Sequence, residues 1–282
     1  MRIPIKSVFA FGSTLLFFVV VVCFASNAPA KAQLPPHPAP QAAVVVEPQP
    51  VIQSMNATEA PAPAPAAPRK HTYSSCNVES STVAMTFDDG PHPKLTPKLL
   101  DILKERNIKA TFFVIGKCVA EYPDIAKRIV DEGHEIANHS WNHPQLTKLS
   151  PSAFDAEISQ TTDAIQKATG VRPVTMRPPY GAINPALTKR LNDEYGLCVI
   201  LWSVDPQDWK IRKSEHVSSH IIKNTAPGSI ILAHDIHPST IDAMPTALDA
   251  LQSKGYKFVT VSELIAMDRP AAPKTESPKA KP

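Results

Sequence analysis

The chain has 282 residues, of which 43% are hydrophobic and 20% are charged. This composition can build one sizeable globular core, and it excludes a chain that is disordered throughout. The formal net charge is only +3 and the lysines and arginines are scattered, so we expect no nucleic acid as a partner.

The first 32 residues have the pattern of an export signal. Arg2 and Lys6 precede an uncharged run over residues 7–30, which ends in small residues at cleavage spacing. The apolar part, residues 8–25, approaches the roughly 18–20 residues that span a bilayer, so an uncleaved anchor is the alternative. We therefore predict a signal peptide or signal anchor over residues 1–32. The protein is then secreted, periplasmic or held in the cell envelope, with a membrane tether if the segment is retained.

Two further segments have the composition of tails. Fourteen of the 30 prolines crowd into residues 34–68 and 269–282. The Pro/Ala-rich residues 33–74 predict an extended linker without a packed core, and residues 269–282 predict a disordered tail with added lysine. Residues 75–268 are left as a single folded domain.

Within residues 75–268, short apolar or β-branched runs alternate with helical patterns. The predicted strands are residues 82–87, 110–115, 134–137, 174–177, 198–204, 229–233 and 257–261. The predicted helices are one capped by Thr96, one over 123–132, one from Ser150 to the closing Gly170, and those over 184–195, 214–224 and 240–254. This alternation indicates a parallel α/β sheet, either an irregular barrel or an open doubly wound sheet, with its site at the carboxyl ends of the strands.

Three cysteines follow the predicted export signal. Because this number is odd, the chain is no disulfide scaffold. Cys198 lies in the apolar run 197–202, which predicts a buried, inert thiol. A bridge between Cys76 and Cys118 is left open.

Acids, imidazoles and one guanidinium stand at five of the predicted strand ends. Because the carboxyl ends of parallel strands meet at one edge, we expect these side chains to form one site. The Asp-Gly-Pro of residues 89–91 is also ordinary turn chemistry, which is the alternative for that segment. The residues are Asp88, Asp89, His139, His143, Arg177, Asp205, Asp208 and His234.

The types of these residues indicate a divalent metal site. Two adjacent carboxylates repel each other unless a cation lies nearby, and His139 and His143 are spaced so that both imidazoles can face one point. One carboxylate with two histidines leaves positions for water and substrate, as in catalytic sites. Zinc fits best, with cobalt, nickel and manganese as alternatives.

The remaining residues then divide the proton transfers. The second carboxylate is free to accept a proton from a water molecule whose pKa the cation lowers. Arg177 can keep that carboxylate ionised, with a structural salt bridge as its alternative. His234 ends an apolar strand, where it is either a satisfied core residue or, facing a hydrolytic metal, the general acid.

Five short segments carry a resemblance to a known family. Each alone is common, but all five in this order at strand ends are specific. Over roughly residues 80–265 the sequence resembles the NodB-like polysaccharide deacetylases, also classed as carbohydrate esterase family four. The segments are residues 86–91 (TFDDGP), 139–143 (HSWNH), 177–180 (RPPY), 205–209 (DPQDW) and 232–234 (LAH).

The resemblance implies a distorted (β/α) barrel of about seven parallel strands and a role for each matched residue. A single metal is held by Asp89, His139 and His143. Asp88 is the base, tethered by Arg177, and the Tyr180 backbone N–H helps to stabilise the oxyanion. The remaining roles fall to His234 as the acid, Asp208 rather than Asp205 as the group that orients it, and Trp209 and Leu232 as the apolar slot for the acetyl methyl.

The expected function is metal-dependent removal of N-acetyl groups from the amino sugars of a cell-wall polysaccharide. The run 234–238 (HDIHP) and the exported layout favour peptidoglycan, with chitin or chitooligosaccharides and xylan O-acetyl esters as alternatives. A non-catalytic wall-binding module is the rival class, and it has no use for an arginine-held second carboxylate. We expect His237 to cap the next helix, with support of the site as its alternative.

Overall fold

The computed structural model describes residues 71–269. The predicted export signal, with its membrane tether, lies outside the described residues, as do most of the predicted linker and tail. None of the helices in the described part combines the length and the apolar character of a membrane span.

The strands form one parallel sheet that closes on itself. Along the sheet the order is β1-β6-β5-β4-β3-β2-β7, and β8 pairs with β2. Just after β6, Val204 forms a parallel bridge with Ile231 of β7, so the path from β6 to β7 becomes a ring. The distorted barrel is therefore confirmed over the open sheet. In residues 71–269 the strands are β1 Thr72–Tyr73, β2 Thr82–Asp88, β3 Thr111–Val114, β4 Glu135–Asn138, β5 Thr175–Met176, β6 Cys198–Ile200, β7 Ile230–His234 and β8 Lys257–Phe258.

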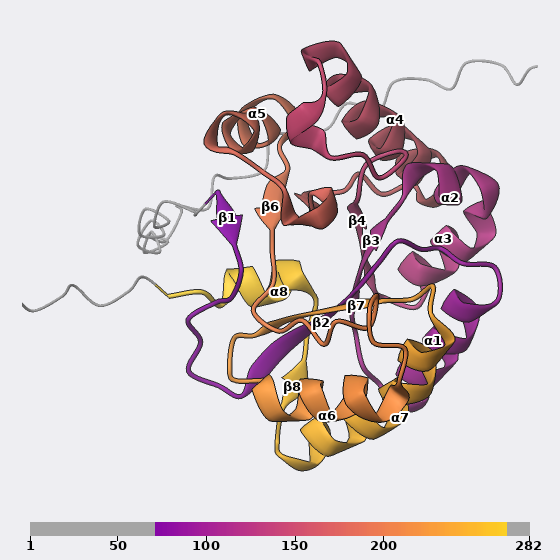
Figure 1. Ribbon diagram of the computed structural model, residues 1–282, viewed down its shortest axis with the longest axis vertical. Coiled ribbons are helices and arrows are strands. Elements are labelled where there is room, and N and C mark those ends of the chain that lie inside the picture. The colour runs from indigo at the N-terminus through magenta and orange to yellow at the C-terminus, as the bar shows by residue number, and fades with distance from the viewer. Residues whose placement is uncertain (1–70, 270–282) are drawn as a thin grey trace, which may run out of the picture. The chain divides into compact units, whose positions relative to one another are not determined.

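Most helices lie around the outside of the strands (Figure 1). The exception is α8, whose first residues donate hydrogen bonds to side chains at the amino ends of two strands: the Val261 N–H donates to Thr111 Oγ1 and the Ser262 N–H to Glu135. It therefore covers the end of the barrel opposite the polar strand ends. The helices are α1 Leu95–Glu105, α2 Gly116–Glu121, α3 Pro123–Asp131, α4 Pro151–Thr169, α5 Pro185–Tyr195, α6 Ser214–Asn224, α7 Pro238–Ser253 and α8 Val261–Ala266, with 3₁₀ turns at Leu146–Lys148 and Pro179–Gly181.

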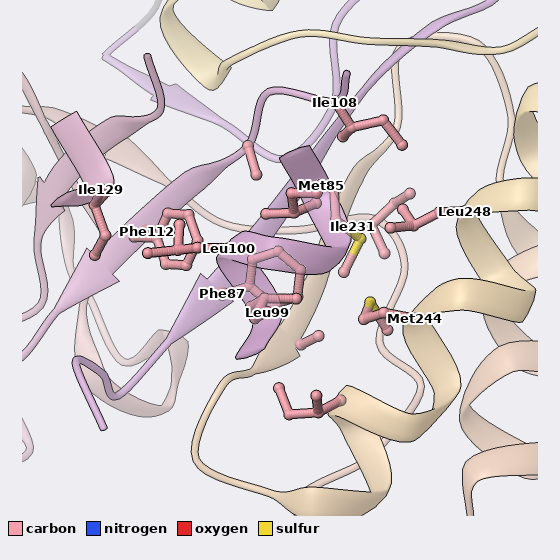
Figure 2. Close-up of a cluster of buried hydrophobic side chains, with 14 of the residues drawn as sticks. Met85, Phe87, Leu99, Leu100, Ile108, Phe112, Ile129, Ile231, Met244 and Leu248 are labelled. Atoms are coloured by element: carbon pink, nitrogen blue, oxygen red, sulfur yellow. The ribbon is translucent and has the colours of Figure 1, made fainter. Parts of the chain in front are cut away.

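The alternation of side chains along β2 decides which of its residues can reach the site. Met85 and Phe87 belong to the core between the strands and helices α1 and α7, where Leu99 and Met244 also lie (Figure 2). Successive side chains of a strand point to opposite faces, so Thr86 and Asp88 face the interior of the barrel instead. Truncating Phe87 to alanine would cost about 3–5 kcal/mol of this packing.

The folded part begins earlier than predicted. Thr72 and Tyr73 form β1, which pairs with Val199 and Ile200 of β6, and Tyr73 is buried. The predicted linker over residues 33–74 therefore ends too late. The structure also adds α2, which was not predicted. Near the C-terminus the predicted strand over residues 257–261 ends at Phe258, because Thr260 caps α8 with the reciprocal hydrogen bonds of a capping box.

The prediction that Thr96 caps the first helix is wrong. α1 begins at Leu95, and the side chain that accepts from its first backbone N–H groups is His92, through Nδ1 to Lys94 and Leu95 at 3.1 Å each. Thr96 is buried in the first turn, and its hydroxyl donates to Asp235. The Thr-Pro pattern is typical of a helix start, but a tertiary contact uses this threonine.

The cysteines show one departure from expectation and answer one open question. Cys198 is half-buried rather than buried, with its Sγ 3.9 Å from the His71 carbonyl oxygen. No bridge joins Cys76 to Cys118. Burial raises the pKa of the Cys118 thiol, which favours its unreactive protonated form.

Candidate functional site

The predicted site residues gather at one cleft at the carboxyl ends of the strands. The cleft has a volume of about 590 Å³. Arg177 and Asp208 stand behind it, each fully buried. The other eight predicted site residues line it: Asp88, Asp89, His139, His143, Tyr180, Trp209, Leu232 and His234.

Asp88 and Arg177 form a buried ion pair at the ends of β2 and β5. Arg177 Nη1 lies 2.7 Å from Asp88 Oδ1 and 2.8 Å from Thr86 Oγ1. The other guanidinium nitrogens donate to the carbonyl oxygens of Ile200 and Leu201 at 3.3 and 3.1 Å. Each guanidinium nitrogen therefore has an acceptor, and the charged hydrogen bond from Nη1 fixes the orientation of the Asp88 carboxyl group.

Asp89, His139 and His143 form a second group, which we name the cation pocket. His139 Nε2 and His143 Nε2 each lie 3.5 Å from Asp89 Oδ1, and one ligand atom from each residue lies within 4.8 Å of the others. Burial alone would raise the pKa of Asp89, but the neighbouring imidazoles of His139, His234 and His143 lower that pKa to about 2. The carboxyl is therefore ionised at neutral pH.

Both histidines turn Nε2 toward Asp89. His139 Nδ1 lies 2.6 Å from the Arg177 carbonyl oxygen, and a carbonyl can only accept, so Nδ1 carries a proton; in the neutral ring Nε2 then holds the lone pair. Burial lowers the pKa of His143, which favours its neutral ring. Asp89 Oδ1 is buried without a hydrogen-bond donor. An ionised oxygen and two imidazole lone pairs without protons between them fit a divalent cation.

The loop that carries both histidines is a tight turn rather than a helix. His143 N donates to Ser140 Oγ at 3.0 Å, while Trp141 N and Asn142 N donate to Glu157 of α4 at 2.7 and 2.8 Å. Ser140 and His143 have φ values of 65° and 61°, a region that costs energy for residues with a Cβ. Such strain persists only where the surroundings hold it, and it often marks a functional site.

Left-handed backbone recurs in the motifs. In residues 71–269, six non-glycine residues have positive φ. Five of these fall inside the five segments of the resemblance: Asp89, Ser140, His143, Tyr180 and Gln207.

His234 and Asp208 form a second charge pair on the opposite side of the cleft. His234 Nδ1 lies 2.7 Å from Asp208 Oδ1, and its backbone N–H donates to Oδ2 at 2.8 Å. Thr240 also donates to Oδ2, at 2.6 Å. Burial lowers the pKa of His234, but the Asp208 carboxylate outweighs it and raises that pKa to about 9. His234 is thus a cation at neutral pH, and it presents Nε2 as a proton donor.

The predicted substrate residues differ in exposure. Tyr180 is 69% exposed and Trp209 50%, whereas Leu232 is 4% exposed. The Tyr180 ring lies edge-on to His143 with 4.6 Å between centroids. Asp205, which was the alternative to Asp208, instead accepts the Gln207 backbone N–H at 2.7 Å and shapes the turn.

The structure adds a buried carboxyl that the sequence did not single out. Asp235 is fully buried and accepts from Thr96, and its Oδ1 has no donor. Burial raises the pKa of Asp235 to about 7. A Cβ on Gly90 would come within 2.4 Å of this carboxyl, so only glycine fits the turn that follows Asp89. The sequence did offer a signal for Asp235, because this acidic residue stands directly after an apolar strand.

Six other residues line the cleft: Asp205, which was the alternative to Asp208, and five that were not predicted as site residues, Pro178, Trp202, Arg212, Ile236 and His237. His237 occupies the N-cap position of α7, but its side chain makes no capping hydrogen bond. Its ring instead lies 5.9 Å from that of His234, so the expected capping role of the side chain is wrong.

Comparison with known proteins identifies the source of these motifs. The family described as polysaccharide deacetylase matches residues 76–198. The peptidoglycan-N-acetylglucosamine deacetylase PgdA of Listeria monocytogenes is 47% identical over 182 residues, which is 64% of this chain but only 38% of that protein. A peptidoglycan-N-acetylglucosamine deacetylase of Bacillus cereus is 39% identical over 65% of this chain and 87% of its own length.

The fold comparison agrees. The structure of the peptidoglycan deacetylase PdaC from Bacillus subtilis matches with a TM-score of 0.64 and 41% identity, over 67% of this chain and 92% of that one. Because the chain covers 87% of the length of a relative that is 39% identical to it, the chain belongs to the polysaccharide deacetylase family.

Proposed function

We propose that this protein is a metal-dependent hydrolase that removes acetyl groups from the amino sugars of peptidoglycan. The observation that carries the proposal is the joint presence, in one cleft, of a cation pocket, an arginine-held carboxylate and a protonated histidine. Amide hydrolysis needs a polarised carbonyl, a proton acceptor for water and a proton donor for the leaving amine.

The cation pocket supplies the first requirement. Asp89, His139 and His143 would hold a divalent cation, and zinc suits one carboxylate and two imidazoles, with cobalt, nickel or manganese as substitutes. When bound, the cation supplies a Lewis acid that lowers the pKa of water and polarises a carbonyl.

The chain's own residues move the protons. Asp88 accepts the proton of the attacking water, and Arg177 holds its carboxyl group in place at the cleft. His234 donates its Nε2 proton to the leaving nitrogen, since Asp208 holds the ring by Nδ1 and keeps it charged. Water thus adds its oxygen to the acetyl carbon, the C–N bond breaks, and acetate and a free amine form.

Three residues orient the acetyl group. The Tyr180 backbone N–H stabilises the oxygen of the carbonyl as it becomes anionic. Leu232 and Trp209 line the same cleft and provide apolar surface for the methyl. A wall-binding module would need neither the Asp88–Arg177 pair nor the Asp208–His234 pair. The presence of both pairs therefore supports catalysis over binding.

The relatives favour peptidoglycan as the polymer. The Listeria and Bacillus cereus proteins are named for this activity. The export pattern of residues 1–32 fits the same substrate, which lies outside the cytoplasmic membrane. We include in the proposal that the protein acts in the cell envelope or as a secreted enzyme, tethered if the segment is kept. Fractionation of cells that express the full chain tests this location.

The test of the function is acetate release from acetylated peptidoglycan, chitooligosaccharides and acetylxylan by the zinc-loaded chain. We expect the highest kcat/KM on peptidoglycan. If only acetylxylan released acetate, the substrate would be an O-acetyl ester rather than an N-acetyl amide. Tight binding to sacculi without acetate release from any polymer would favour the binding module.

A further inference from the structure

The catalytic cleft continues into a second cavity beside it. That cavity has a volume of about 560 Å³ and shares Arg212 and His237 with the cleft. It lies against the first residues of α6 and α7, because Ser214 and Ser239 also line it. A polymer whose acetylated sugar occupies the cleft therefore has room for a neighbouring unit at this junction.

Arg212 stands at the junction with its charge unused. Its side chain is exposed, and within residues 71–269 it has no hydrogen bond or ion pair. This differs from Arg177, Arg190 and Arg128, which all hold carboxylates. Three acidic residues also line the two cavities: Asp205 in the cleft, and Glu215 and Asp242 in the second cavity. None of them lies within ion-pair distance of Arg212.

Two further features make the junction suitable for an anion. Neither α6 nor α7 has a side-chain cap at its N-terminus, so their first N–H groups and the positive ends of their dipoles face the second cavity. The Ser239 hydroxyl is buried there without a partner in the described residues. Lys213 adds a second cation to the lining.

We propose that Arg212 and the second cavity form a subsite for a carboxylate carried by the sugar next to the one that is deacetylated. The inference rests on the proposed function and narrows its substrate. In peptidoglycan every second sugar bears a lactyl ether, whose carboxylate is either free or continues into an acidic stem peptide. Chitooligosaccharides offer no anion at this position. A guanidinium binds a carboxylate through paired hydrogen bonds, so Arg212 selects anionic glycans over neutral ones.

The test compares kcat/KM for acetate release on three soluble substrates. These are neutral N-acetylglucosamine oligomers, glycan strands with free lactyl carboxylates, and glycan strands that carry stem peptides. The variants are Arg212→Gln and, as a matched control, Arg172→Gln, which removes an exposed arginine that lines neither cavity.

We expect Arg212→Gln to lower the ratio of anionic to neutral kcat/KM roughly tenfold or more, the size of one charged hydrogen bond. Arg172→Gln should leave that ratio at the wild-type value. A fall restricted to one of the anionic substrates identifies the lactyl or the peptide carboxylate as the source. An unchanged ratio in Arg212→Gln overturns the subsite while acetate release still supports the enzyme. Absence of acetate from all three substrates with the wild-type chain overturns both proposals.

Discussion

The cation pocket lies in one cleft with two ion pairs, Asp88–Arg177 and Asp208–His234. The carboxylates of the pocket and of the pairs differ in burial and in hydrogen bonding. Asp88 and Asp208 are almost fully buried, and donors of the chain hold both: Asp88 accepts from Arg177, and Asp208 accepts from the His234 ring, the His234 backbone N–H and Thr240. Asp89 is a neighbour of Asp88 in sequence, yet its side chain is 19% exposed and its Oδ1 has no donor.

This difference in hydrogen bonding fits the different role that we propose for each group. A base and an acid keep their orientation and charge when the chain satisfies them completely, because no water then competes for their partners. A cation ligand must instead keep a lone pair open. The alternation along β2 and the left-handed φ of 75° at Asp89 send two adjacent carboxylates into these two environments.

The largest effect is expected where a fully satisfied pair loses one member. Arg177→Met leaves the Asp88 carboxylate buried without its cation, which should destabilise the protein by about 3–5 kcal/mol and abolish acetate release. Arg190→Met is the control, because Arg190 pairs with Asp155 and Glu194 at the surface, where solvent screens an ion pair and it contributes little to stability. Urea unfolding of both variants measures the difference. Equal losses would mean that the Asp88–Arg177 pair is an ordinary salt bridge.

These environments show how far sequence reasoning reaches. Strand ends and motif order predicted the barrel edge and the residues that meet there, because parallel strands converge and each motif is local. The sequence could not predict that Asp235 turns inward against Gly90 while Thr96 supplies its donor. Thr96 and Asp235 are 139 positions apart, and from its local sequence alone Thr96 is typical of a helix cap and Asp235 of a surface acid. His237 was misjudged similarly, since its backbone position did not determine its side-chain contact.

A smaller effect is expected on the acid side. Asp208 raises the pKa of His234 to about 9 from an ordinary 6.5, so the pair's stabilisation is fully present below pH 6.5 and lost as the pH rises through about 9. Asp208→Asn should move the NMR titration of His234 in the metal-free protein back toward its ordinary range. The alkaline limb of the activity profile should also shift to lower pH. If neither moves, Asp208 does not set the charge of His234.

The smallest effect concerns the buried carboxyl behind the cation pocket. The pKa of Asp235 is raised from 3.8 to about 7 by burial, so the folded state binds its proton more tightly than the unfolded state. That stabilisation is complete below pH 3.8 and is lost as the pH rises through about 7, at no more than ~1.4 kcal/mol per pH unit. Asp235→Asn should therefore flatten the decline of the unfolding free energy between pH 5 and 7. Parallel wild-type and variant curves would show that Asp235 stays ionised.

The division of labour between the two adjacent aspartates is the central claim, and one measurement tests it directly: acetate release by Asp88→Asn and by Asp89→Asn across a zinc titration, with bound zinc determined on the same samples. Asp88→Asn should bind zinc like the wild type and yet lose roughly 10²–10⁴-fold in turnover at every zinc concentration, because the water lacks a proton acceptor. Asp89→Asn should bind zinc weakly and regain part of its turnover as zinc rises, since a neutral oxygen replaces an anionic ligand. Rescue of Asp88→Asn but not of Asp89→Asn would reverse the assignments, and near-normal turnover of both at saturating zinc would contradict the hydrolytic mechanism.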